Sequence, residues 1–402
     1  MRARVECSLR RKRTNFVFGF LGAVFLLHGL VLGSTVARGT SARKERLGED
    51  NRLPYVSAIL MEAKTGQILF ERESHKQWPP ASITKMMLML LVMEKVRQGV
   101  ISLSDSVEVS ARASKIGGSQ VYLKQGEAFT LEEMMKAIVI HSANDASEAV
   151  AERIGGSAEG FVDMMNRRAK EMGLKHTQYL SVHGLPPEKG QPSDLTSAYD
   201  IAVLAREIVK FPEVLKWAST QKEEFRGGKF VLENTNHLIG KFPGADGLKT
   251  GSYHKAGFNL AATAERDGLR LISVTLGSPS DKIRRSEAAR LLSMGFNDYK
   301  MLTVMKAGDT ISQEVRIKGG RINSIRPAML NPAQVVIRRS EEKQVKSNVR
   351  LNNSVWAPLK KGDKIGELVV TLGEKTLGKF NLVATEDVEK SNIIKRLWNR
   401  VF

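Results

Sequence analysis

A serine and a lysine, Ser82 and Lys85, stand three residues apart at the start of an apolar run. This spacing places both side chains on one face of a helix, within reach of each other. Pro80 suits a first helical turn, so Ser82 lies near a helix N-terminus, where the dipole favours a developing alkoxide. A lysine in an apolar setting gives up its proton more readily, so the pair could act as nucleophile and base. On spacing alone, a surface lysine beside a capping serine is the commoner arrangement.

Two further polar motifs follow along the chain. Ser142 and Asn144 are two residues apart in HSANDASE, where both could point into a cleft from a bend between helices. Lys249, Thr250 and Gly251 begin a strand, where the two polar side chains could bind a carboxylate and the glycine would let a substrate backbone come close. The alternatives are an ordinary helix junction and an ordinary turn. An earlier Lys-Thr-Gly at residues 64–66 shows that this triplet also occurs by chance.

The segments around these motifs alternate between strand and helix patterns. The first and last apolar strand patterns each contain a hairpin signal, at Gly66 and at Asp267-Gly268. Thr130 and Glu133 match a capping box. We therefore predict an α+β domain in which the first and last strands share one sheet. The strand patterns cover residues 56–72 and 257–277, and the helical patterns cover 80–96, 130–155, 157–173, 196–211 and 283–299.

The C-terminal quarter has a different character. Short β-like runs alternate with turns over residues 302–384, which predicts a small all-β domain. Residues 385–402 fit an amphipathic helix that would lie in a membrane interface, with docking onto its own domain or a frayed tail as alternatives. Its basic face carries Lys395, Arg396 and Arg400, and its apolar face carries Ile393, Ile394, Leu397, Trp398, Val401 and Phe402.

The N-terminus predicts export. Six basic residues and one acid precede an apolar run from Phe16 to Leu32, and a small-x-Ala site ends at Ala37. We interpret residues 1–37 as a signal peptide, with an uncleaved anchor as the alternative, and residues 38–52 as a tether. The only cysteine, Cys7, lies in the signal, so the exported chain would have no disulfide. The net charge of +19 is compatible with an anionic partner, but aromatic residues are only 6% and zinc-finger spacing is missing, which argues against nucleic acid.

The three motifs together are more specific than any of them alone. Ser-x-x-Lys, Ser-x-Asn and Lys-Thr-Gly in this order form the set found in penicillin-binding proteins and class A β-lactamases. With the flanking ASITKMM, HSANDAS, VHGLP, DGLKTGS and AGFNLAATA, the chain resembles the low-molecular-mass penicillin-binding proteins, the serine-type D-Ala-D-Ala carboxypeptidases. The resemblance implies a penicillin-binding/β-lactamase-like transpeptidase domain over residues 53–301, with an antiparallel sheet and a helical cluster. It also covers the β domain and an amphipathic helix that anchors the family to the membrane.

The resemblance also implies roles for individual residues. Ser82 would be the nucleophile, Lys85 its base, and Ser142 the proton relay to the leaving amine. Asn144 would hold the substrate amide, and backbone N–H groups of Ser82 and Ser252 would form an oxyanion hole. The terminal carboxylate would be bound by Lys249 and Thr250 next to Gly251, and Arg284 aligns with a family arginine near it, with adjacent Arg285 as the alternative register.

The activity implied by the resemblance is removal of the terminal D-alanine from peptidoglycan stem pentapeptides, without a metal or another cofactor. The partners would be stem peptides, β-lactams and the membrane surface, at the periplasmic face of the cytoplasmic membrane. A role in peptidoglycan maturation and cell shape would follow. The alternatives are an endopeptidase with the same mechanism, a β-lactamase whose only loop glutamate is Glu188, and a non-catalytic wall-binding protein.

Overall fold

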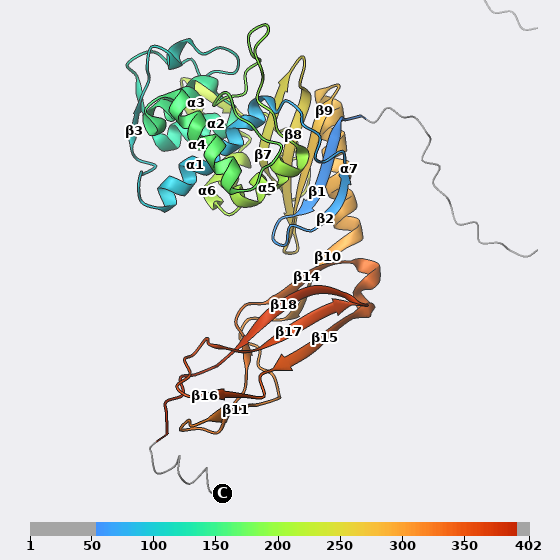
Figure 1. The fold of residues 1–402 in the computed structure, drawn as a ribbon. Coiled ribbons are helices and arrows are strands. Elements are labelled where there is room, and N and C mark those ends of the chain that lie inside the picture. Colours follow the sequence, from blue (N-terminus) through green and yellow to red (C-terminus); the bar gives the residue numbers. More distant parts are fainter. Residues whose placement is uncertain (1–53, 392–402) are drawn as a thin grey trace, which may run out of the picture. The chain divides into compact units, whose positions relative to one another are not determined.

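The computed structural model describes residues 54–391. The N-terminal signal and tether lie outside these residues. The catalytic-motif region contains a five-stranded antiparallel sheet in the order β2-β1-β9-β8-β7 (Figure 1). Its first strand pairs with a strand more than 200 residues later, with Ser57 opposite Leu276, so the first and last strands share one sheet as predicted. The strands are β1 (Ser57–Glu62), β2 (Ile68–Arg72), β7 (Ala245–Tyr253), β8 (Gly257–Arg266) and β9 (Leu269–Ser278).

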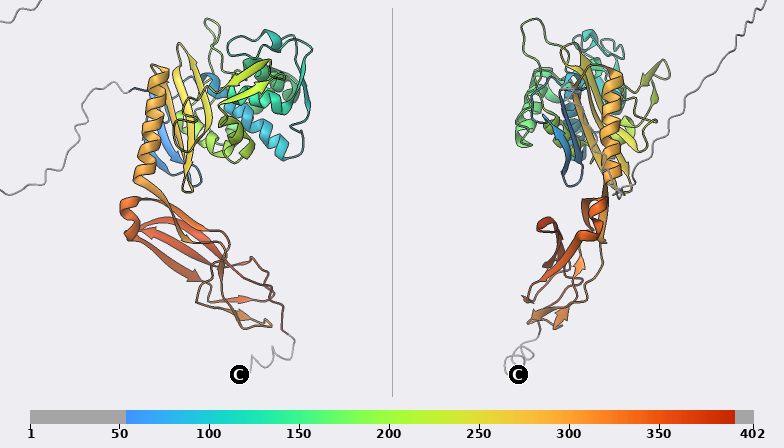
Figure 2. Two further views of the ribbon diagram at one scale, coloured as in Figure 1. Left: turned by 180° about the vertical axis from the view of Figure 1, so that it is seen from behind. Right: turned by 90° about the vertical axis from the view of Figure 1, so that its right-hand side faces the viewer.

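Alternation along the strands sends side chains to two cores. In β1, Ile59 and Met61 face the core shared with most of the helices, whereas Ala58 and Leu60 face a second core. The second core is covered by α7 (Asp281–Asp298), which lies along the opposite face of the sheet (Figure 2). Both faces of the sheet are therefore covered at its centre, which explains why β1, β8 and β9 are buried along most of their length, whereas the edge strand β2 is not.

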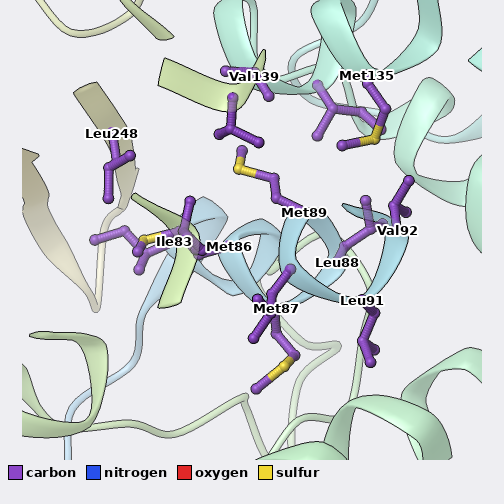
Figure 3. Close-up of a cluster of buried hydrophobic side chains, with 14 of the residues drawn as sticks. Ile83, Met86, Met87, Leu88, Met89, Leu91, Val92, Met135, Val139 and Leu248 are labelled. Carbon is purple, nitrogen blue, oxygen red and sulfur yellow. The ribbon is translucent and has the colours of Figure 1, made fainter. Parts of the chain in front are cut away.

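The helical cluster is built around α1 (Lys85–Arg97). Residues 85–93 of this helix are all buried, so it is apolar on every side, as expected for a central helix (Figure 3). Its neighbours include Met135 and Val139 of α2 and Leu248 of β7. The surrounding helices are α2 (Leu131–Ile140), α3 (Asn144–Gly155), α4 (Ala158–Glu171), α5 (Ala198–Ile208) and α6 (Pro212–Ala218).

Several local predictions are confirmed. The capping box is present, with the Thr130 hydroxyl accepting from the Glu133 N–H and the Glu133 carboxylate accepting from the Thr130 N–H. The pattern over 130–155 is broken into α2 and α3 at Ser142. Two small hairpins had no strand prediction from the sequence; they are formed by β3 (Ser106–Glu108) with β4 (Ala128–Thr130) and by β5 (Lys222–Phe225) with β6 (Phe230–Glu233).

The C-terminal part is all β, in agreement with the predicted small β domain. A four-stranded sheet in the order β13-β18-β17-β15 and a three-stranded sheet β12-β11-β16 enclose two apolar clusters. Its strands are β10 (Tyr299–Met305), β11 (Val315–Lys318), β12 (Ser324–Ile325), β13 (Ala328–Met329), β14 (Ala333–Arg338), β15 (Val345–Leu351), β16 (Ser354–Trp356), β17 (Lys364–Leu372) and β18 (Lys375–Val383).

The start of the predicted C-terminal helix is not helical. Residues 385–391 contain no helix: residues 385 and 386 form a bend, and Val388 and Lys390 form bridges with Leu359 and Gly320. Backbone N–H and C=O groups of this segment make hydrogen bonds to the β domain, so they are not available for the bonds of a helix. The apolar and basic residues from Ile393 to Phe402 lie outside the described residues. Within residues 54–391, no helix is long and apolar enough to cross a membrane.

Candidate active site

Ser82 lies in a 3₁₀ turn, Ala81–Thr84, that immediately precedes α1. It does not cap the helix, because no side-chain capping bond is made at this end; its half-buried hydroxyl instead accepts from Lys85 Nζ at 3.0 Å. The turn is strained, with φ of +51° at Ala81. Asn259 of β8 holds it by donating from Nδ2 to the carbonyls of Pro79 and Pro80 at 2.9 and 3.1 Å.

Lys85 is fully buried and donates to three oxygens. Besides Ser82, its Nζ bonds to Asn144 Oδ1 at 2.6 Å and to the carbonyl of His183 at 2.7 Å. Desolvation, together with the nearby Lys249 cation, holds the pKa of Lys85 well below its usual range. The buried carboxylates Asp194 and Asp145 oppose this effect only in part. The geometry therefore gives a lysine that can accept the Ser82 proton.

Ser142 and Asn144 come from the break between α2 and α3. Ser142 has φ of +66°, a left-handed conformation that costs a serine free energy and turns the chain between the two helices. The amide of Asn144 bridges Lys85 and the backbone, because its Nδ2 donates to the Gly117 carbonyl at 2.7 Å. Its orientation is thus fixed from two sides.

Lys249 of β7 is the second buried lysine of the site. It donates to Ser142 Oγ at 2.8 Å and to the Thr250 carbonyl at 2.9 Å. Burial and the Arg284 cation lower the pKa of Lys249 to about 7. Two serine–lysine pairs, Ser82–Lys85 and Ser142–Lys249, therefore lie close enough for the Lys249 cation to lower the pKa of Lys85.

Strand β7 runs directly beside the nucleophile turn. A Cβ placed on Gly251 would lie 2.6 Å from the Pro80 carbonyl and 2.8 Å from the Ser82 nitrogen, so only glycine fits there. The Ser252 side chain is exposed, and its backbone follows the point of closest approach to Ser82. The hydroxyl of Thr250 donates to Thr235 Oγ1 at 2.7 Å.

Arg284, rather than Arg285, points inward from α7. It is 6% exposed, pairs with Asp281 at 2.6 Å and donates to the Asn259 carbonyl at 3.2 Å. It also donates to the Gly251 carbonyl at 3.5 Å, makes no hydrogen bond to Lys249 or Thr250, and lies behind strands β7 and β8. Its effect on the site is therefore through charge and through the position of these strands.

Four contributors were not predicted as site residues. Asp194 accepts from the hydroxyls of Thr84 and Ser181 and from two backbone N–H groups, which fixes the segment carrying His183. Asn259 supports the nucleophile turn, and Thr235 contacts Thr250. The sequence signals were VHGLP, which contains His183, and AGFNLAATA, which contains Asn259, but neither indicates which atoms contact the site.

The arrangement suits acyl transfer by a serine. The Ser82 hydroxyl could act as nucleophile and the desolvated Lys85 as its base. Ser142 provides a second hydroxyl, and the buried Lys249 could bind an anionic group of a ligand. Glu188, the only loop glutamate considered as a water-activating base, is exposed. Among residues 54–391, no group of three or more histidine, cysteine, aspartate or glutamate side chains could hold a metal ion.

Comparisons with known proteins give a consistent picture. A family model described as D-alanyl-D-alanine carboxypeptidase matches residues 49–280, and one described as penicillin-binding protein 5, C-terminal domain, matches residues 299–390. The D-alanyl-D-alanine carboxypeptidase DacF of Bacillus subtilis is 36% identical over 377 residues, which are 92% of this chain and 95% of that protein.

Solved structures agree with these matches. Penicillin-binding protein 5 of Haemophilus influenzae has a TM-score of 0.72 at 31% identity and covers 84% of this chain and 98% of its own. Penicillin-binding protein D2 of Listeria monocytogenes, solved in an ampicillin-bound form, has a TM-score of 0.56 at 30% identity and covers 61% of this chain and 98% of its own.

Proposed function

Because the chain belongs to the D-alanyl-D-alanine carboxypeptidase family, we propose that it trims the terminal D-alanine from peptidoglycan stem peptides through an acyl-enzyme on Ser82. The observation that carries this proposal is the buried Lys85, with its Nζ 3.0 Å from Ser82 Oγ. A general base must lie within hydrogen-bond reach of the proton it takes and must be unprotonated at the working pH. Lys85 lies within that reach, and burial and the Lys249 cation lower its pKa in the direction that a base requires.

In the first half of the reaction, Lys85 takes the hydroxyl proton as Ser82 Oγ attacks the carbonyl carbon of the penultimate D-alanine. The resulting oxyanion is stabilised by the backbone N–H groups of Ser82 and Ser252. The C–N bond then breaks, and the leaving amine receives a proton by way of Ser142. Free D-alanine leaves, and the remaining peptide is esterified to Ser82.

In the second half, water attacks the ester and Ser82 regains its proton. Lys85 is the nearest base for the water, because it is already hydrogen-bonded to the ester-forming oxygen. The net result is one peptide bond hydrolysed. No metal is needed, because the charges that develop face backbone donors and two lysines.

Substrate recognition rests on Lys249 and Thr250. With a pKa of about 7 in the free site, Lys249 is poised between its charged and neutral forms. A terminal carboxylate next to it would favour the ammonium form. Substrate binding would therefore stabilise the positive charge on Lys249. A peptide with a free C-terminal carboxylate would gain this interaction, and a peptide without one would not.

Acylation by penicillins is part of the same proposal. The Listeria relative was solved with ampicillin bound, and the strained lactam carbonyl would take the place of the peptide carbonyl. Residues 1–37 would direct export, and residues 392–402 would hold the enzyme on the outer face of the cytoplasmic membrane through their basic and apolar residues. This places the site in the compartment that contains the stem peptides.

The test is release of D-alanine from a peptide ending in D-Ala-D-Ala, together with labelling by a fluorescent penicillin and mapping of the labelled residue. We expect D-alanine release by the wild type, none by Ser82→Ala, and label on Ser82 alone. Label elsewhere, or equal release by both proteins, would contradict the proposal. Rapid hydrolysis of penicillin would instead favour a β-lactamase.

A further inference from the structure

Glu148 is a buried carboxylate close to the site that has no role in the reaction as described so far. It is 1% exposed and lies on α3 four residues after Asn144. This spacing places both side chains on the same face of the helix. Asn144 accepts from Lys85 at 2.6 Å, so Glu148 lies one helical turn beyond a residue that touches the catalytic base.

The two carboxylate oxygens of Glu148 face different segments. Oε1 forms an ion pair with Arg112 Nε at 2.7 Å, and Oε2 lies 4.0 Å from His183 Nε2. Arg112 is followed by a 3₁₀ turn, Ala113–Lys115, and then by the residues that hold Asn144. The Asn144 side chain donates to the Gly117 carbonyl, and the Asn144 backbone N–H donates to the Ser119 carbonyl.

The ring of His183 is fixed as a neutral imidazole. Burial and the Lys85 and Arg112 cations lower the pKa of His183 to about 3. The Leu185 N–H donates to Nδ1 at 3.2 Å, so the single ring proton must be on Nε2, the nitrogen that faces Glu148. The carbonyl of the same residue accepts from Lys85 at 2.7 Å.

Stability alone gives a weak reason for a carboxylate at this position. Asp145, three residues earlier on α3, is equally buried but accepts from the backbone N–H groups of Val121 and Leu123, so its charge is well solvated by the protein. Glu148 is paired instead with Arg112, whose side chain is 54% exposed and shared with Glu159. Replacing such a buried pair by apolar groups is often neutral or stabilising.

We propose that Glu148 is a positioning residue for the catalytic lysine. Anchored by Arg112, its carboxylate orients the His183 ring and thereby the His183 backbone, whose carbonyl holds Lys85 Nζ at Ser82. The inference rests on the proposed roles of Ser82 and Lys85. It adds a contact to the base, through the His183 carbonyl, besides the one that the Asn144 amide makes.

The experiment compares Glu148→Gln, His183→Asn and the double variant with the wild-type chain. The measured quantities are the rate constant for acylation by a fluorescent penicillin and the constant for its initial non-covalent binding. We expect Glu148→Gln to lower the acylation rate about tenfold, since small misplacements of a catalytic group are costly, with initial binding unchanged. The double variant should be no slower than His183→Asn, because the two changes act through one path.

Glu94→Gln is the matched control. Glu94 is also a largely buried carboxylate paired with an arginine, Arg168, at 2.7 Å, but it lies near the C-terminal end of α1. We expect this variant to melt at a lower temperature and to acylate at the wild-type rate. A loss of rate as large as that of Glu148→Gln would mean that any such deletion slows the enzyme, and would overturn the inference.

The remaining outcomes separate the inference from the proposed function. Suppose that the wild type is labelled on Ser82 and releases D-alanine, so that the function stands. The positioning role is then refuted if Glu148→Gln acylates at the wild-type rate. It is also refuted if the loss of acylation rate in the double variant is the product of the two single losses. If the wild type is not labelled on Ser82, the function itself fails. Should Glu148→Gln not fold, His183→Asn decides, because normal acylation by that variant also refutes the role.

Discussion

Gly251 sets the distance between strand β7 and the nucleophile, so Gly251→Ala tests the geometry of the site without removing a reacting group. The added Cβ would lie 2.6 Å from the Pro80 carbonyl, 2.8 Å from the Ser82 nitrogen and 3.0 Å from the Ile83 nitrogen. Ordinary contact begins at 3.4 Å, so strand and turn must separate by about 0.8 Å. All three neighbours are backbone atoms, which cannot rotate away as a side chain could.

A displacement of this size bears directly on the rate. Misplacing reacting groups by about 1 Å can cost about a hundredfold, and the same separation widens the proposed oxyanion hole. We expect the acylation rate constant of Gly251→Ala to fall by about ten- to a hundredfold. Overpacking should also cost about 1–3 kcal/mol of unfolding free energy.

The assay is rapid-quench acylation with a fluorescent penicillin at saturating concentration, combined with thermal unfolding. Gly247→Ala is the control on the same strand, where the nearest atoms to the new Cβ are side-chain methyls, those of Ala218 and Thr263 at 3.3 Å and that of Leu215 at 3.9 Å. It should lose stability but little rate. The reasoning is refuted if Gly251→Ala acylates as fast as Gly247→Ala.

Three further outcomes follow from the charges and the strained backbone. The Lys249 cation lowers the pKa of Lys85, so Lys249→Met should raise the pKa of Lys85. The acidic limb of the acylation–pH profile should then move to higher pH. If it does not move, the charge of Lys249 has no effect on Lys85. The pKa of Lys249 is about 7 in the folded state and higher in the unfolded state. Between these two pKa values the unfolded chain binds more protons than the folded chain, so the free energy of unfolding rises with pH in that window. The melting temperature of the wild type should therefore rise more steeply from pH 7 to pH 10 than that of Lys249→Met, and parallel curves would refute this. Ser142→Gly should relieve the strain at φ +66° and raise the melting temperature while lowering D-alanine release, whereas Ser142→Ala should lower release without the gain; a lower melting temperature for the glycine variant would contradict the strain argument.

The sequence was sufficient to predict several of the side chains that the fold brings together, because part of their spacing is local. Ser82 and Lys85 lie within one helical turn of each other, and the break at Ser142 was visible as polar residues between two apolar periods. The sheet could also be inferred, because hairpin signals are local and α+β domains bring their first and last strands together. The fold class is confirmed by the structure and by the family matches.

Contacts between distant segments could not be read in this way. Asp194 and Asn259 are ordinary polar residues in the sequence, and only the fold brings them to Thr84 and Pro80. Neighbouring Arg284 and Arg285 differ only in which side of α7 they occupy. The predicted start of the C-terminal helix is wrong for a related reason. Lys390 and Val388 form bridges with Gly320 and Leu359, which are distant in the sequence, and these contacts outweigh the local helical pattern.

The strand order has a consequence for when the enzyme becomes active. Strand β1 is made first, but its neighbour β9 ends at Ser278, so the sheet cannot close until more than 200 further residues are present. Pairing segments this far apart along the chain is slow, because loop closure must precede the contacts that stabilise it. The nucleophile turn is held by Asn259 and Gly251, which also belong to late strands. A growing chain therefore already contains Ser82 and Lys85 before the site can assemble, and activity begins only when β7 to β9 have joined the sheet.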